Sequence, residues 1–140
     1  MDLRKAITVT PLRKIPVLGG DVLHAIKSSD NEFVGFGEAY FSLIENKMIK
    51  GWKKHNVMTM NVIVPVGEVK FVFYDPGNEE FRTEVIGSKC YNRITVLPGT
   101  WVAFQGLSES QSLILNIANI LHDPNEADIC DLQDINFNWE

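Results

Sequence analysis

The sequence has few cysteines and no long apolar run. Only Cys90 and Cys130 are cysteines among its 140 residues, and they lie too far apart for a C-x-x-C motif, which predicts two reduced thiols. No window approaches the roughly 18 consecutive apolar residues that a membrane-spanning helix needs. The first residues also lack the apolar stretch of a secretory signal. We therefore expect a cytoplasmic protein without a membrane span.

An excess of positive charge is also lacking. The chain has 13 Lys and Arg against 18 Asp and Glu, which gives a formal net charge of -5. General binding of nucleic acid relies on a broad cationic surface, so we expect no nucleic-acid partner. The hydrophobic share of 45% is too high for a disordered chain. The length suits a single domain, residues 1–140, whose core needs no disulfide or metal.

Sequence motifs that hold metals or cofactors are absent. The three histidines, His24, His55 and His122, lie far apart, which is not the spacing of metal ligands. The sequence has no phosphate-binding P-loop, no dinucleotide glycine motif and no G-x-S-x-G motif. We expect neither a metal nor another cofactor.

The chain does contain many short runs rich in Val, Ile, Phe, Tyr and Thr. Turn signals such as Asp75-Pro76-Gly77-Asn78 and Pro98-Gly99 separate these runs. This pattern is typical of all-β proteins. The expected strands are residues 6–9, 22–26, 33–44, 48–55, 58–66, 68–74, 81–86, 91–97, 100–105 and 112–117.

Some expected strands are apolar on both faces, as in residues 62–64 and 71–73. A strand of this kind is covered on both sides, so two packed sheets are expected. The C-terminal part departs from this pattern, because Asp123 can cap a helix, Pro124 fits its first position and Glu126 favours its dipole. We expect a short helix over residues 124–132.

Positive charge is concentrated in the expected strand 48–55 and the residue before it, which together carry Lys47, Lys50, Lys53, Lys54 and His55. Alternate residues of a strand share a face, so Lys53 and His55 point one way while Lys50 and Trp52 point the other. A bulge at Gly51 would turn Lys50 to the side of Lys53 and His55. The alternative is a solvated edge strand, where lysines discourage aggregation.

A histidine beside ammonium groups is disfavoured in its charged form, so His55 is expected to be neutral near pH 7 and able to accept a proton. A neutral imidazole is what a general base requires. Lys53 is the other candidate. It either stabilises a developing oxyanion as an ammonium group or, if desolvated, acts as the base itself.

Three segments carry a family resemblance: residues 48–55 (MIKGWKKH), 64–72 (VPVGEVKFV) and 94–104 (ITVLPGTWVAF). They resemble the dTDP-4-dehydrorhamnose 3,5-epimerase family of cupins, whose corresponding segments look like G-V-L-R-G-L-H-x-Q, V-x-G-x-V-x-D-V and I-P-x-G-F-A-H-G-F. The resemblance extends from Gly20-Asp21 to Phe137-Asn138-Trp139. It implies a jelly roll or double-sheet β-barrel and a homodimer. It also implies metal-independent action on a nucleotide-linked 4-keto sugar in surface-polysaccharide biosynthesis.

The resemblance assigns Lys50 to the family's arginine that holds the diphosphate, and Glu38 and Tyr40 to polar positions of its pocket. The family's catalytic histidine, assisting lysine, acid tyrosine and later histidine fall on Lys53, Met60, Asn116 and Ala103. The segment that supplies the histidine's aspartate partner has no counterpart. Related dTDP-sugar 3,4-ketoisomerases show R-G-x-H-A-H-K in this strand, and His55 matches the second of their two histidines.

The sequence therefore predicts an all-β cupin, a jelly roll or double-sheet β-barrel with a short C-terminal helix, that acts as an epimerase or isomerase on a nucleotide sugar. His55 and Lys53 are expected at the reacting centre. Substrate contacts are expected from Lys50, Glu38, Tyr40, Asn61, Trp101, Gln105 and Asn116. For the aromatic residues the alternative is core packing. The alternative function is a non-catalytic cupin that binds a sugar nucleotide or a partner enzyme.

Overall fold

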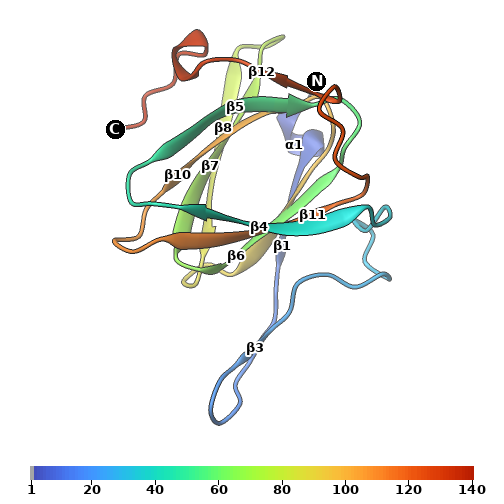
Figure 1. Cartoon of the computed structure of the whole chain (residues 1–140), viewed down its shortest axis with the longest axis vertical. Coiled ribbons are helices and arrows are strands. Elements are labelled where there is room, and N and C mark those ends of the chain that lie inside the picture. The colour runs from blue at the N-terminus through green and yellow to red at the C-terminus, as the bar shows by residue number, and fades with distance from the viewer. Residues whose placement is uncertain (1) are drawn as a thin grey trace.

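The computed structural model describes residues 2–140, and most of the regular structure is β-strand (Figure 1). One helical turn, α1 (Leu3–Ala6), precedes the strands and a 3-10 helix, η1 (Leu132–Asp134), follows them. The strands are β1 (Ile7–Pro11), β2 (Lys14–Ile15), β3 (Val22–Leu23), β4 (Glu38–Ile44), β5 (Ile49–His55), β6 (Met60–Val66), β7 (Glu68–Asp75), β8 (Glu80–Gly87), β9 (Asn92–Val96), β10 (Trp101–Gly106), β11 (Ser112–Ala118) and β12 (Ala127–Ile129).

Two five-stranded sheets face each other. The first has the strand order β1-β9-β6-β11-β4 and the second β12-β5-β10-β7-β8, with antiparallel pairing between neighbours. The expected double-sheet β-barrel is thus confirmed. A separate two-stranded sheet, β2-β3, projects from the barrel (Figure 1). No helix within residues 2–140 is long and apolar enough to cross a membrane.

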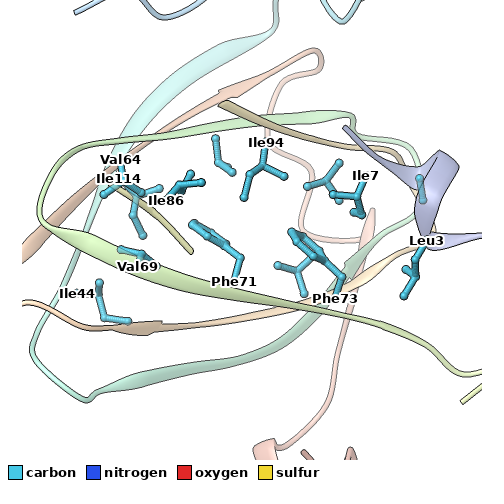
Figure 2. Close-up of a cluster of buried hydrophobic side chains, with 14 residues drawn as sticks. Leu3, Ile7, Ile44, Val64, Val69, Phe71, Phe73, Ile86, Ile94 and Ile114 are labelled. Carbon is cyan, nitrogen blue, oxygen red and sulfur yellow. The ribbon is translucent and has the colours of Figure 1, made fainter. Parts of the chain in front are cut away.

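The main core fills the space between the sheets on the side of β1, β9, β7 and β8. Figure 2 shows its side chains from Leu3 and Ile7 near α1, past Phe73 and Phe71, to Ile44 at the other end. Phe73 and Ile94 are fully buried. Burial of such side chains contributes about 1.5–3 kcal/mol each, so this side of the barrel holds the two sheets together.

The helix expected over residues 124–132 is wrong. Asp123 accepts a hydrogen bond from the backbone N–H of Asn125 at 2.9 Å, which closes a turn rather than starting a helix. The chain then extends as β12 and pairs with β5, where Ala127 lies opposite His55. Pairing with an exposed strand edge satisfies backbone groups that a short helix would leave open, and tertiary context here overrides local capping signals.

Two expected strands are shorter than the sequence indicates. The strand expected over 33–44 begins only at Glu38, because Gly35 has a φ of +126°, which breaks the extended backbone. The strand expected over 22–26 ends at Leu23. Beyond it, Tyr91 donates a hydrogen bond from its hydroxyl to the carbonyl of His24 at 2.7 Å, and Arg93 donates one to the carbonyl of Ala25 at 2.8 Å. These side-chain bonds replace a strand ladder.

Candidate active site

A cavity of about 240 Å³ opens between the β4-β11 side of one sheet and the β5-β10 side of the other. Its walls contain apolar side chains from the edge of the core and polar side chains nearer the opening. The lining consists of Tyr40, Ser42, Lys50, Gly51, Lys53, His55, Met60, Val62, Phe71, Val102, Phe104, Ile114 and Asn116. Of the nine predicted site residues, it therefore brings five together: His55, Lys53, Lys50, Tyr40 and Asn116.

A β-bulge in β5 directs three of these side chains into the cavity. Lys53 pairs with Val102 and Lys50 with Phe104, so two residues of β5, Gly51 and Trp52, lie opposite the single residue between them on β10. Directly paired residues point to the same face of a sheet. Lys50 therefore faces the cavity with Phe104, as the expected bulge requires, although simple alternation would place Lys50 on the outer face.

His55 is held by a carboxylate. Its Nδ1 lies 2.6 Å from Oε1 of Glu126, and the side chains of the two residues are only 12% and 4% exposed. The other oxygen of Glu126 accepts hydrogen bonds from the backbone N–H groups of Val57 at 2.8 Å and Met58 at 2.9 Å. Glu126 thus fixes both the imidazole and the loop between β5 and β6.

The pKa of Glu126 is lowered to about 2. Burial alone would raise it, but hydrogen bonds from His55, Met58 and Val57 to the carboxylate oxygens outweigh burial and favour the ionised form. An ionised carboxylate only accepts hydrogen bonds, so the proton between the two residues lies on Nδ1 of His55. The second imidazole nitrogen, Nε2, is then unprotonated in the neutral ring and available as a base.

Lys50 and Lys53 give the cavity two positive charges. The ammonium group of Lys50 donates a hydrogen bond to the carbonyl of Leu43 at 2.8 Å and lies 6.0 Å from the centre of the Phe104 ring. Within residues 2–140 no carboxylate forms an ion pair with either lysine. Lys54, which points to the outer face, is paired with Asp128 at 3.3 Å. The cavity lysines are therefore free to meet an anionic ligand.

Tyr40 and Asn116 form the neutral wall of the cavity. They are directly paired across β4 and β11, and the amide nitrogen of Asn116 donates a hydrogen bond to the Tyr40 hydroxyl at 2.6 Å. The amide oxygen of Asn116 is buried and has no hydrogen-bond partner within residues 2–140. The more exposed Tyr40 hydroxyl is the polar group of this wall that a ligand hydroxyl can reach.

Four other predicted site residues lie outside the cavity lining. Glu38 lies at the start of β4, beyond Tyr40. The amide of Asn61 is on the opposite face of its sheet, where its oxygen accepts from Thr95 at 2.6 Å. Trp101 packs on the outer face of β10, under Lys54, and Gln105 donates to the carbonyl of Lys47 at 3.2 Å. Strand alternation explains the positions of Asn61, Trp101 and Gln105, because the cavity receives their neighbours along each strand instead. Glu38 shares the face of Tyr40 but lies beyond the end of the cavity.

Sequence reasoning missed two polar residues of the site. Ser42 is two residues after Tyr40 and shares its face, so strand alternation was a sufficient signal for it. Glu126 was assigned to a helix start, and the chain was expected to lack an acidic partner for the imidazole; the structure corrects both points. The sequence-based expectation that ammonium groups keep His55 neutral also left out the nearest charge, the carboxylate of Glu126. No group of three or more His, Cys, Asp or Glu in the described chain, residues 2–140, is arranged to hold a metal ion.

Solved structures with the same arrangement of strands are enzymes of sugar nucleotides. A dTDP-sugar isomerase from Desulfovibrio desulfuricans G20 is 30% identical, with a TM-score of 0.91 over 96% of this chain and 91% of that chain. A sugar 3,4-ketoisomerase from Thermoanaerobacterium thermosaccharolyticum, in complex with TDP, is 15% identical, with a TM-score of 0.76 over 88% and 87% of the two chains.

A third structure shows the same fold at lower identity. The dTDP-6-deoxy-D-glucose-3,5-epimerase of Legionella pneumophila Philadelphia 1 is 13% identical, with a TM-score of 0.80 over 92% of this chain and 74% of that chain. The sequence matches no protein-family model and no curated protein. The identity to the dTDP-sugar isomerase and the coverage of both chains are high enough to show that the two proteins are homologous. The expected family resemblance is thus confirmed. The chain belongs to the family of cupin-fold dTDP-sugar isomerases.

Proposed function

We propose that the protein is a metal-independent epimerase or isomerase of a nucleotide-linked 4-keto sugar. The observation that carries the proposal is the hydrogen-bonded His55–Glu126 pair at the wall of a cavity that also contains two lysines without an ion pair in the described chain. Family membership supports the same class of substrate. The reaction begins with removal of a proton from the carbon next to the sugar carbonyl, and the electron pair of that C–H bond moves to the carbonyl oxygen as an enolate.

His55 is the proposed base. Glu126 holds the proton on Nδ1, so the lone pair of Nε2 takes the proton from carbon. The imidazolium that forms is stabilised by the adjacent carboxylate, as in other histidine–carboxylate pairs. Delivery of a proton from water to the other face of the same carbon gives epimerisation, and His55 then releases its own proton to solvent. Return of the His55 proton to the former carbonyl carbon, with transfer of the neighbouring hydroxyl proton to the former carbonyl oxygen, gives a shifted carbonyl.

Lys53 is the proposed partner of the enolate oxygen. It points into the cavity on the same side of β5 as His55, two residues away, so a sugar between them would meet both groups. A fixed ammonium group is most valuable where negative charge develops during the reaction. The alternative, in which Lys53 is itself the base, predicts a different outcome in the experiment described below.

Lys50 is the proposed contact of the diphosphate. Its ammonium group lies on the same cavity face as Lys53, and one of its three N–H donors is used by Leu43. The others are open to phosphate oxygens, which lysine binds as a point charge. The Tyr40–Asn116 pair faces these cations across the cavity, where it is placed to bind the sugar's hydroxyl groups.

Incorporation of deuterium from heavy water tests the proposal directly. Incubation with dTDP-, GDP- and CDP-linked 4-keto sugars should label a ring carbon next to the carbonyl of at least one of them. The His55→Asn variant should lose exchange, while Lys53→Met should keep a slow exchange if Lys53 only stabilises the enolate. Loss of exchange in Lys53→Met with exchange retained in His55→Asn would make Lys53 the base. A protein that binds these nucleotides without any exchange is a binding module rather than an enzyme.

We further propose that the protein is a cytoplasmic homodimer that supplies surface-polysaccharide biosynthesis. The family resemblance supports each of these points, and the β2-β3 hairpin supports the dimer. This hairpin projects from the barrel with Leu18 fully exposed and Val17 and Val22 about half exposed (Figure 1). Light scattering after size-exclusion chromatography should give twice the chain mass, and replacement of residues 17–20 by Gly and Ser should give monomers.

A further inference from the structure

The outer face of β5 carries a large aromatic side chain at the bulge. Trp52 is fully buried and packs beside Val72 and Ala103 of the neighbouring strands. Its ring centre lies 6.3 Å from that of Tyr74 and 6.1 Å from that of Trp139. Its indole N–H has no acceptor in the described chain, so packing alone holds the ring in place. The Trp52 ring therefore packs against the bulge on the face opposite the cavity.

The C-terminal segment, residues 130–139, covers the Trp52 ring. The backbone N–H of Cys130 donates to the carbonyl of Trp52 at 3.2 Å. Leu132, Phe137 and Trp139 then pack over the outer face, with the rings of Phe137 and Trp139 4.9 Å apart. A side-chain carbon added to Gly51 would contact the backbone of Leu132 at 3.8 Å, so the segment lies directly on the bulge.

No residue of this segment lines the cavity, but the segment affects the pairing of β5, which sets the direction of a cavity side chain. A bulge leaves one residue out of the strand ladder, and regular pairing would restore the lost backbone order. Regular pairing would also turn Lys50 to the outer face, because a shift of one residue reverses every side chain beyond it. In that register Trp52 would stay on the outer face beside Ala103. Lys50 would have to share this face with the C-terminal segment, whose Leu132 already lies against Gly51.

We propose that Trp52 and the C-terminal segment 130–139 position Lys50, by fixing the bulge that turns its ammonium group into the cavity. The inference rests on the proposed function in one respect, namely that Lys50 contacts the diphosphate. It predicts that side chains on the outer face of the barrel control affinity for a nucleoside diphosphate. It also predicts that they leave the reacting centre at His55 unchanged, because His55 lies beyond the bulge and is held by Glu126.

Titration calorimetry with dTDP tests this coupling without any need for turnover. The set comprises the full-length wild type, Lys50→Ala, the tail variant Phe137→Ala/Trp139→Ala, and the tail variant combined with Lys50→Ala. Lys50→Ala and the tail variant should each weaken dTDP binding about tenfold. The combined variant should be no weaker than Lys50→Ala alone, because residues that act through one group are not additive. Trp139→Ala alone, a milder change, should show the same effect in part.

Phe36→Ala is the matched control, because Phe36 is an exposed aromatic residue in the loop before β4 and belongs neither to the cavity lining nor to the cluster around Trp52. It should bind dTDP as the wild type does. Equal weakening of binding by the tail variant with and without Lys50 would overturn the inference, as would wild-type affinity in a folded tail variant. If Lys50→Ala itself binds dTDP normally, the diphosphate role of Lys50 and the inference both fail. Deuterium exchange that depends on His55 would still stand in that case.

Discussion

The two sides of the barrel interior are built from the same pair of sheets but hold opposite kinds of side chain. Between β1-β9 and β7-β8 the inward residues are apolar and fully packed, as at Phe73 and Ile94. Between β4-β11 and β5-β10 the inward residues include two lysines, a histidine, a tyrosine and an asparagine around a cavity. Strand alternation is the same on both sides, so the fold does not dictate the polar side.

This difference separates the residues that stabilise the protein from those proposed to bind and react. Burial of apolar side chains stabilises the packed side, whereas charged side chains around a cavity add little stability and are costly to desolvate. The polar side therefore reflects function. Substitutions on the packed side should mainly lower stability, whereas substitutions on the cavity side should mainly lower turnover or binding.

The largest effect is expected from His55→Asn on the cavity side. Removal of a general base lowers rates by about 10²–10⁴-fold, so we expect kcat to fall by about 10³-fold. The affinity for dTDP should change little, since Lys50 is untouched. The melting temperature should fall, because the buried carboxylate of Glu126 loses its hydrogen bond to the imidazole. Steady-state kinetics and calorimetry check both parts. A residual rate within tenfold of the wild type would contradict the assignment of His55 as the base.

Phe73→Ala should produce the converse result on the packed side. Phe73 is fully buried in the main core, and removal of such a ring typically costs about 3–5 kcal/mol of the free energy of unfolding. Urea denaturation should show this loss, while kcat and dTDP affinity well below the unfolding transition should stay within about threefold of the wild type. A variant of normal stability with poor dTDP binding would break the proposed division.

Glu126→Gln should affect both properties, because Glu126 contacts both His55 and the β5-β6 loop. The folded-state pKa is about 2, below the ordinary value of 4.5, so the unfolded chain binds the proton first as pH falls. The contribution to stability is therefore complete above about pH 4.5 and is lost between pH 4.5 and 2; it amounts to about 3 kcal/mol.

The measurement is the free energy of unfolding of the wild type and Glu126→Gln at several pH values. Their difference should be largest near pH 7 and should shrink below pH 4.5. The variant should also lose about 10²-fold in kcat, since a neutral amide no longer favours the proton on Nδ1 of His55. A difference in stability that stays constant down to pH 2 would exclude an ionised Glu126 in the folded protein.

Gln105→Ala should have the smallest effect of the set. The Gln105 side chain is outside the cavity lining and donates one hydrogen bond to the carbonyl of Lys47. Surface changes of this kind usually alter stability by less than about 0.5 kcal/mol. Turnover should stay within twofold of the wild type. A tenfold loss would mean that the substrate extends beyond the cavity to the outer face of β10.

Much of the fold was predictable because strand signals are local. Alternating apolar residues and turns such as Asp75-Pro76-Gly77-Asn78 indicated most strands, and the basic stretch indicated where His55 and Lys53 face the cavity. Gly51 marked the bulge that adds Lys50. These features depend on neighbours within a few residues along the chain.

The remainder depended on contacts between distant segments. The local signals at Asp123 and Pro124 favoured a helix, but the free edge of β5 lies 71 residues before Glu126 and no local pattern reveals it. Asn61 and Gln105 have the polar character of ligand contacts. Only the register of their strands shows that they face away from the cavity.

The two oxygens of Glu126 have separate duties, one toward the imidazole and one toward the backbone of Val57 and Met58. A homologue that had lost catalysis would still be selected to retain Glu126, because the β5-β6 loop depends on its carboxylate. Survival of an acidic residue at this position in a homologue is therefore evidence of a conserved architecture. Under the proposed mechanism, a homologue that also retains the histidine is the one expected to catalyse the reaction.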